Sequence, residues 1–261
     1  MNVVIERRAS SAAKWARRLA IFSAVLMLTA VAGHRFALVE TIPFFWLLGI
    51  VATLALTALV LAGIGLSRLW AYGDRGGRAS TRAVLLSIVV LLPFAFGVYL
   101  AFSLPRLTDI STDPLDPPVF ATARGQGMNP VAAISADDAA LQLAYYPAAT
   151  GRRYPLLFDR AHEIVVAVLG NLGWRIVSNP PLQLEIHETT IEAVARSPIF
   201  GFVSDVAIRI IDEGETSYID VRSVSRYGMH DLGDNAAKVA RFFSAVEAEI
   251  LAVNAPVIQT R

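Results

Sequence analysis

The sequence contains no cysteine among its 261 residues. A disulfide framework, a thiolate metal site and a thiol nucleophile are therefore excluded. Charged residues are also scarce, at 17%, whereas hydrophobic residues make up 55%. This composition is too apolar for an average soluble protein, so the location of the apolar excess decides the class.

Several motifs of catalysis and cofactor binding are missing as well. The chain has no Gly-x-Ser-x-Gly elbow, no phosphate loop ending in Gly-Lys-Ser/Thr, and no Gly-x-Gly-x-x-Gly after a strand. His162-Glu163 and His187-Glu188 begin like a zinc-protease signature, but no second histidine follows four residues after the first. We therefore expect no metal and no cofactor.

The two parts of the chain differ in charge. Residues 1–104 hold 10 Lys+Arg against 3 Asp+Glu, whereas residues 105–261 hold 13 against 19. Nucleic-acid binding is disfavoured, because phosphates need a basic footprint and the folded C-terminal part is acidic.

Residues 1–104 contain three uncharged hydrophobic runs. The second and third are long enough for the roughly 30 Å hydrocarbon core of a bilayer, which takes about 20 helical residues. Pro93 in the third run should kink the helix without ending it. The first run, 19–33, is shorter and spans only if its flanking arginines snorkel. The sequence predicts three transmembrane helices, at about 15–38, 42–67 and 82–104.

The first run also has the features of a cleaved signal peptide, with a basic start and Ala30-Val31-Ala32 as a small-residue cleavage site. Both alternatives give the same orientation. The N-terminus and the loop at 68–82 are basic, so the positive-inside rule predicts that both are cytoplasmic. We expect a multi-pass protein of a bacterial inner membrane whose C-terminal domain lies in the periplasm.

Seven of the 13 prolines fall within residues 105–155. Proline fixes φ and denies the preceding residue the helical region, so this segment should be extended. Composition favours a tether, with a strap along the domain as the alternative. Within the segment, Ser135 followed by Asp138 predicts the capped start of a short helix.

Residues 156–254 show alternating helical and strand patterns. Apolar residues at helical spacing predict a helix that stops at Gly173 and a second one near the C-terminus. Between them, alternation predicts strands over 174–178, 182–188, 190–196, 206–210 and 217–225. The positions that define the helices are Leu157, Ala161, Ile164, Val165, Val168 and Leu172, then Ala236, Val239, Phe243, Val246 and Ile250. We expect a two-layer α+β domain, an antiparallel sheet with both helices on one face.

The last two predicted strands should form a hairpin. A two-residue loop at Glu213-Gly214 would put Ile208 opposite Ile219 in the core. On the other face, the same register puts Asp205 opposite Arg222, close enough for an ion pair. Arg226, nearer the start of the final helix, would then be the arginine that meets an external anion.

A polar run follows this hairpin and begins the final helix. Asp231 can cap that helix, with Asp234 at the third helical position. Because a helix start beside arginines is also where anions bind, the candidate ligand-binding residues are Arg222, Arg226, Asp231 and Asn235.

The C-terminal part resembles a family of uncharacterised bacterial and plant-organelle proteins that carry the domain of unknown function 1499. The most specific stretch is Arg-Ser-x-Ser-Arg-x-Gly followed by Asp-Leu-Gly-x-Asn. Family members often have two aspartates where this chain has Ser204-Asp205. The resemblance implies that the proline-rich segment belongs to the domain, and it implies no activity. The matching stretches are 107–120, 141–147, Gly173-Trp174, 191–210 and 220–242.

Binding and catalysis both fit these features, and a structural role in a larger membrane complex is a third possibility. The first is a non-catalytic periplasmic module that binds an envelope component or a partner protein, held in the lipid bilayer by the helices. The alternative is a hydrolase or transferase that acts on an anionic envelope lipid or glycan through Asp205, Arg222, Arg226 and Asp231. Ser225, His230 and Asp231 have the residue types of a catalytic triad, but residues so close in sequence would have to fold back on one another.

Overall fold

The computed structural model describes residues 8–122, 124–182 and 187–254. The chain divides into two compact units, Met1–Tyr99 with Ile199–Gly201 and Leu100–Pro198 with Phe202–Arg261. Each unit has its own packing and is described separately.

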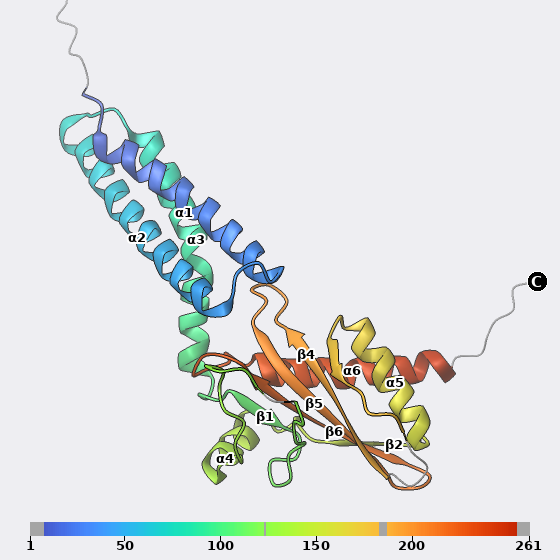
Figure 1. The fold of residues 1–261 in the computed structure, drawn as a ribbon. Helices are drawn as coiled ribbons and strands as arrows, with labels where there is room; N and C mark the ends of the chain where they lie inside the picture. The colour runs from blue at the N-terminus through green and yellow to red at the C-terminus, as the bar shows by residue number, and fades with distance from the viewer. Residues whose placement is uncertain (1–7, 123, 183–186, 255–261) are drawn as a thin grey trace, which may run out of the picture. The chain divides into compact units, whose positions relative to one another are not determined.

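The first unit is a set of three long helices, α1 (Ser11–Arg35), α2 (Thr41–Tyr72) and α3 (Gly77–Ser103) (Figure 1). Among the described residues, these three helices are long and apolar enough to cross a membrane. The three predicted hydrophobic helices are therefore confirmed, and α3 continues through Pro93. Large apolar side chains face outward along their length, as lipid contact requires; examples are Phe22, Trp46, Val60, Leu85 and Phe96.

Small residues bring these helices into close contact. A cluster of buried alanines joins them: Ala16, Ala20, Ala58, Ala62 and Ala83. A Cβ at Gly65 would lie 2.4 Å from Ser80 Oγ and 3.3 Å from the Cα of Ala13. Without a hydrophobic driving force between helices in lipid, such close packing is the main source of association.

The N-terminal end of this unit is tied to the α2–α3 loop. The Ser10 amide donates to the Arg75 carbonyl at 2.9 Å, and the Arg75 amide donates to the Arg8 carbonyl at 2.9 Å. Ser10 also caps α1 by accepting from the amide of Ala13. The basic N-terminus and the basic loop therefore lie at the same end of the helices.

The second unit is built on a six-stranded antiparallel sheet in the order β1-β6-β5-β4-β3, with β2 paired to β6. The elements are β1 (Asp109–Ser111), α4 (Ala136–Tyr145), β2 (Arg152–Tyr154), α5 (Phe158–Asn171), β3 (Arg175–Ser178), β4 (Glu188–Arg196), β5 (Val203–Asp212), β6 (Ser217–Ser225) and α6 (Asp234–Asn254). The predicted strands at 174–178, 190–196, 206–210 and 217–225 correspond to β3, β4, β5 and β6. Most of the strand predicted over 182–188 lies outside the described residues.

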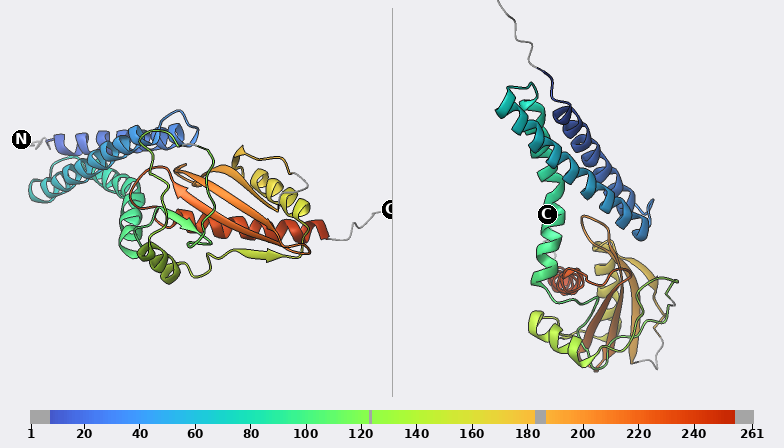
Figure 2. Two further views of the ribbon diagram at one scale, coloured as in Figure 1. Left: turned by 60° about the horizontal axis from the view of Figure 1, so that its bottom comes forward. Right: turned by 90° about the vertical axis from the view of Figure 1, so that its left-hand side faces the viewer.

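Helices α5 and α6 cover one face of this sheet (Figures 1 and 2), which confirms the predicted α+β arrangement. The core contains the apolar positions of both helices together with the inward side chains of β4, β5 and β6. Trp174 stacks on Phe242 with ring centroids 6.2 Å apart. Leu157 is an exception to the predicted helix face, because it is the N-cap of α5 and is 67% exposed.

The opposite face of the sheet is covered by the chain between β1 and α4, residues 112–122 and 124–133. We call this segment, together with β1, the strap. Its β1 segment pairs with β6, and further along the Asn129 amide donates to the Arg226 carbonyl at 2.7 Å. The tether interpretation of the proline-rich segment is wrong for this part of the chain, because hydrogen bonds fix it along the sheet. The predicted cap of the short helix is confirmed, since Ser135 Oγ accepts from the Asp138 amide at 3.0 Å.

The predicted register of the β5–β6 hairpin is wrong by two residues. Asp212 pairs with Ser217, so the loop has four residues, and the Asp212 carboxylate accepts from the Gly214 amide at 2.9 Å. Ile208 therefore lies opposite Val221, and Asp205 lies opposite Val224. Because a shift of two keeps every side chain on its face, the predicted core positions of both strands are nevertheless buried.

Candidate anion site under the strap

The strap buries a layer of charged side chains on the second face of the sheet. These residues alternate with core residues along their strands, as the pleat requires. The layer consists of Glu192 on β4, Asp205 and Arg209 on β5, and Asp220 and Arg222 on β6. Four of these side chains are almost fully buried: Glu192 is 3% exposed, Arg209 7%, Asp220 0% and Arg222 4%. Charges this deeply buried need partners, and most of the partners come from the strap.

Arg209 joins the strap to the middle of the sheet. Its Nη2 donates to Asp220 Oδ2 at 2.6 Å, and its Nη1 donates to Asp116 Oδ2 at 2.8 Å. Burial raises the pKa of Asp220, and the hydrogen bonds from Arg209 oppose that rise. All of these groups face one another, so this cluster has a structural role.

Arg222 pairs with the strap and does not reach Asp205. Its Nη2 donates to Asp109 Oδ2 at 2.6 Å and to the Ala132 carbonyl at 2.6 Å. The predicted Asp205–Arg222 ion pair is therefore wrong. The cause is the longer hairpin loop, which places Ala207 opposite Arg222 and brings the adjacent strand β1 beside it.

Asp205 instead lies between two other arginines. Arg226 donates to Asp205 Oδ1 from Nε at 2.9 Å and from Nη2 at 2.6 Å. Arg124 Nη2 lies 3.0 Å from Asp205 Oδ2. One carboxylate thus serves two guanidinium groups, and this end of the layer carries one excess positive charge.

Both arginines keep donors that this carboxylate does not use. Arg226 uses only Nε and Nη2 in its contacts with Asp205, and a guanidinium has five N–H groups. The Nε of Arg124 is buried and has no hydrogen-bond partner among the described residues. Burial lowers the pKa of the Arg124 guanidinium, and the neighbouring Asp205 carboxylate opposes that shift. Among the described residues, the two guanidinium groups therefore retain hydrogen-bond donors without an acceptor.

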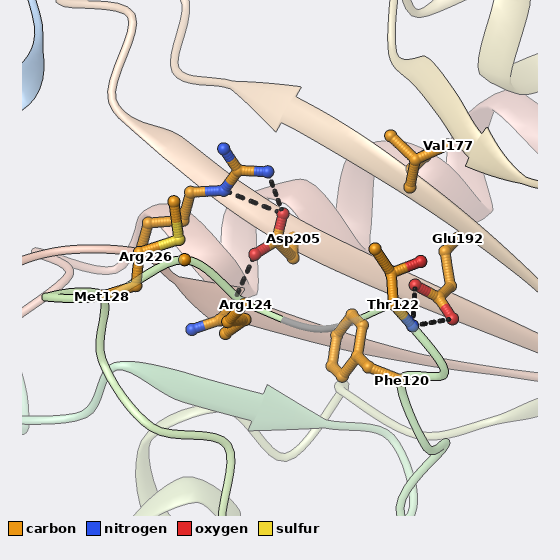
Figure 3. Close-up of a pocket in the computed structure, with 10 residues that line it drawn as sticks. Phe120, Thr122, Arg124, Met128, Val177, Glu192, Asp205 and Arg226 are labelled. Atoms are coloured by element: carbon orange, nitrogen blue, oxygen red, sulfur yellow. Dashed lines mark hydrogen bonds and ion pairs between the residues drawn. The ribbon is translucent and has the colours of Figure 1, made fainter.

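A cavity of about 100 Å³ lies beside these arginines (Figure 3). Its polar lining comes from Arg124, Asp205 and Arg226 at one end and from Glu192 and Thr122 at the other, as the labelled side chains show. Its remaining lining residues are Phe120, Gly125, Met128, Val177 and Ala193. A wider groove of about 660 Å³ shares Phe120, Arg124 and Met128 with the cavity and opens along the strap.

Glu192 is held by backbone amides of the strap. Its Oε1 accepts from the Ala121 amide at 2.6 Å and from the Thr122 amide at 3.2 Å. In the described ranges, no basic nitrogen lies within 4 Å of this carboxylate. Glu192 is thus a buried carboxyl group that backbone hydrogen bonds stabilise and that no cation of the described ranges contacts.

The other two predicted ligand-binding residues lie on the opposite face of the sheet. Asp231 caps the final helix, as predicted, by accepting from the amides of Gly233 at 2.9 Å and Asn235 at 3.0 Å. Asp234 is the first helical residue and not the third. Asn235 is fully buried on the helix side, where its amide binds Ser223, Ser225 and the Thr108 carbonyl. The four predicted residues therefore do not form one site.

The residue types of catalysis do not assemble in the described part of the chain. Ser225 Oγ accepts from Asn235, and His230 Nδ1 accepts from the Leu232 amide, so neither is arranged as part of a triad. Lys238 donates to Ser204 Oγ at 2.9 Å, but both residues are 1% exposed and out of reach of a substrate. The searched residues contain no group of three potential metal ligands.

Sequence reasoning missed Arg124, Glu192 and Phe120. Phe120 lies between two arginines, with the guanidinium carbons of Arg124 and Arg222 at 5.8 and 6.0 Å from its ring centroid. The sequence pattern that could have pointed to them is slight. Arg124 and Phe120 lie in the proline-rich segment, and Glu192 is a single acidic residue between the inward-facing Ile191 and Ala193.

Comparison with known proteins identifies the domain. No curated protein matches the chain. The family model described as a protein of unknown function, DUF1499, matches residues 109–246, from β1 into α6. This match includes the charged layer, the residues that line the cavity and the sheet beneath them. Because the match covers more than half of the sequence, the chain belongs to the DUF1499 family.

Proposed function

We propose that this protein is a multi-pass protein of a bacterial inner membrane and that its α+β domain lies in the periplasm. There it binds an anionic group of an envelope component in the cavity under the strap, without catalysis. The three apolar helices support the membrane anchor. The DUF1499 match supports treating residues 109–246 as one module and carries no activity of its own.

The orientation rests on the basic residues and their position in the helical unit. Arg68, Arg75, Arg78 and Arg82 lie at or beyond the α2 end, and the hydrogen bonds of Ser10 with Arg75 bring the basic N-terminus to the same end. The positive-inside rule places this end in the cytoplasm. Retention of the first helix is supported by its buried alanines, which pack against α2.

The observation that carries the binding function is the sharing of Asp205 by two arginines beside a cavity. Charge-assisted hydrogen bonds to arginine are among the strongest polar contacts in proteins, and phosphate and carboxylate groups fit the guanidinium fork. Both arginines line the cavity that an anion would enter, and Arg226 uses only Nε and Nη2 in its contacts with Asp205. The enzyme alternative has less support, because Asp231 is on the other face of the sheet from Arg226.

Phosphate binding to the full-length chain in neutral detergent tests the proposal. We expect phosphate to raise the unfolding temperature of the wild-type domain, because a ligand that binds only the folded state stabilises it. Arg226→Gln should abolish this rise. Arg153→Gln is the matched control, since Arg153 is 66% exposed on β2 and pairs with Glu213 away from the cavity.

An equal response in wild type and Arg226→Gln would rule out this site. Orientation is tested separately with periplasm-active reporters fused after Gly76 and after Arg261. Activity only in the second fusion is expected, and the reverse pattern would contradict the proposed topology.

A further inference from the structure

The cavity has two ends of opposite charge. At one end, Arg124 and Arg226 share Asp205, which leaves one positive charge in excess. At the other end, Glu192 contributes a negative charge whose carboxylate accepts only backbone amide hydrogens. The charges of the lining residues sum to zero, but the excess positive charge lies at one end of the cavity and the negative charge at the other.

Glu192 has capacity for a further hydrogen-bond donor. Each carboxylate oxygen can accept about two hydrogen bonds. Oε2 accepts a single long bond from the Thr122 amide, at 3.3 Å. A ligand ammonium beside Oε2 would supply both a donor and the missing positive charge, as an ammonium group is a compact charge with three donors.

The size of the cavity and its walls limit the ligand to a short one. An apolar cavity of about 150 Å³ holds benzene, which has six heavy atoms, so about 100 Å³ holds roughly four heavy atoms, enough for an aminoethyl arm. A bulkier anionic group then lies where the cavity meets the groove, which Arg124 also lines. Phe120, Met128 and Val177 provide an apolar wall, which suits a short methylene linker between two charged groups. The adjoining groove leaves room for a larger body attached to the anionic end.

We propose that the ligand of this cavity is a small zwitterion of the ethanolamine phosphate type, with its ammonium at Glu192 and its phosphate at Arg226 and Arg124. This inference rests on the proposed function and adds the second half of the ligand. A purely anionic group would place negative charge near an uncompensated buried carboxylate. A purely cationic one would leave the arginine end unfilled. Only a ligand with both charges complements both ends.

Calorimetric binding to the full-length chain in neutral detergent tests this inference. The probes are glycerophosphoethanolamine, its N-acetylated form and glycerophosphoglycerol, which all have the phosphate but of which only the first has the ammonium. We expect the wild type to bind the first probe at least tenfold more tightly than the other two. Glu192→Gln should remove this preference and keep phosphate binding, because the amide oxygen can still accept from the strap. Glu215→Gln, an exposed change in the β5–β6 loop, is the matched control.

The outcomes separate the two proposals. Equal wild-type affinity for all three probes would overturn the zwitterion and leave the anion site standing, and this result does not depend on whether Glu192→Gln folds. A preference that survives in a folded Glu192→Gln variant would also overturn it. Binding of none of the probes to the wild type would overturn both proposals.

The source of the zwitterion is assigned with the same protein in nanodiscs. If phosphatidylethanolamine discs weaken binding of the soluble probe at least tenfold relative to phosphatidylglycerol discs, the ligand is a lipid headgroup. Equal probe affinity in both discs identifies a free ethanolamine phosphate compound. Either result supports the zwitterion, whereas loss of the soluble-probe preference in both discs would contradict it.

Discussion

Replacing Asp205 with asparagine tests whether one carboxylate holds two arginines under the strap. The side chains of Asp205 and Arg124 are each 13% exposed, and that of Arg226 is 24% exposed. Removing one partner of a buried ion pair costs about 3–5 kcal/mol. Because water reaches part of Arg226, we expect a loss of about 2–4 kcal/mol, which for a domain of this size lowers the unfolding temperature by about 5–15 °C.

The assay is thermal unfolding of the full-length chain in neutral detergent, followed by near-UV circular dichroism. Hydrogen exchange of the strap amides locates the change, since Arg124 donates to the Asn129 carbonyl at 2.7 Å and fixes this part of the strap. Glu215→Gln is the control, and we expect it to stay within about 0.5 kcal/mol of wild type.

The same variant has a second expected effect. Without the Asp205 charge, Arg226 and Arg124 have more donors for an anion, so phosphate should stabilise Asp205→Asn more than wild type. An unfolding temperature within about 2 °C of wild type would refute the shared ion pair. A weaker response to phosphate in the variant would refute the binding role of the arginines.

Three further substitutions have defined outcomes. Arg209→Met leaves Asp220 buried without its cation, at a cost of about 3–5 kcal/mol. Burial raises the folded-state pKa of Asp220 above 3.8, so the contribution of this group to stability is largest below that pH and is lost as pH rises through the raised pKa. Denaturant unfolding between pH 4 and 8 should therefore show a steeper loss in the variant, which lacks the opposing Arg209. Adding Asp220→Leu should restore much of the stability. Asn235→Ala removes three side-chain hydrogen bonds on the helix side and should cost about 3 kcal/mol in unfolding experiments while leaving phosphate affinity unchanged. Gly65→Leu should make the helices more sensitive to heat in detergent, because its Cβ would meet Ser80 and Ala13, whereas Gly63→Leu has nothing within 4 Å and should behave as wild type.

The features that sequence predicted well are those encoded locally. The three long apolar helices follow from the length of their apolar runs. The inward positions of β5 and β6 follow from alternation, which is why they survive the wrong register. The cap at Ser135 follows from two residues three apart. In each case, the information lies within a single element.

The hairpin register failed because it depends on the conformation of a few loop residues. Glu213-Gly214 has the appearance of a two-residue turn, but Glu213 donates its amide to the Thr216 carbonyl at 2.9 Å, and Gly214 has a φ of +86°. Two more residues thus enter the loop. The consequence for the site is large, since this shift separates Asp205 from Arg222.

The location of the site follows from contacts between residues far apart in sequence. Glu192 and Asp205 alternate with core residues and therefore looked exposed to solvent, whereas the strap buries both. Glu192 accepts a hydrogen bond from an amide 71 residues away in the sequence. The strap has no periodic pattern from which such a contact could be predicted. The same contacts make strap and cavity one unit, because lifting the strap would remove the amide donors of Glu192 and leave Asp205 with Arg226 alone. A ligand that neutralises both ends of the cavity therefore stabilises the closed strap, and by linkage an ordered strap strengthens binding of that ligand.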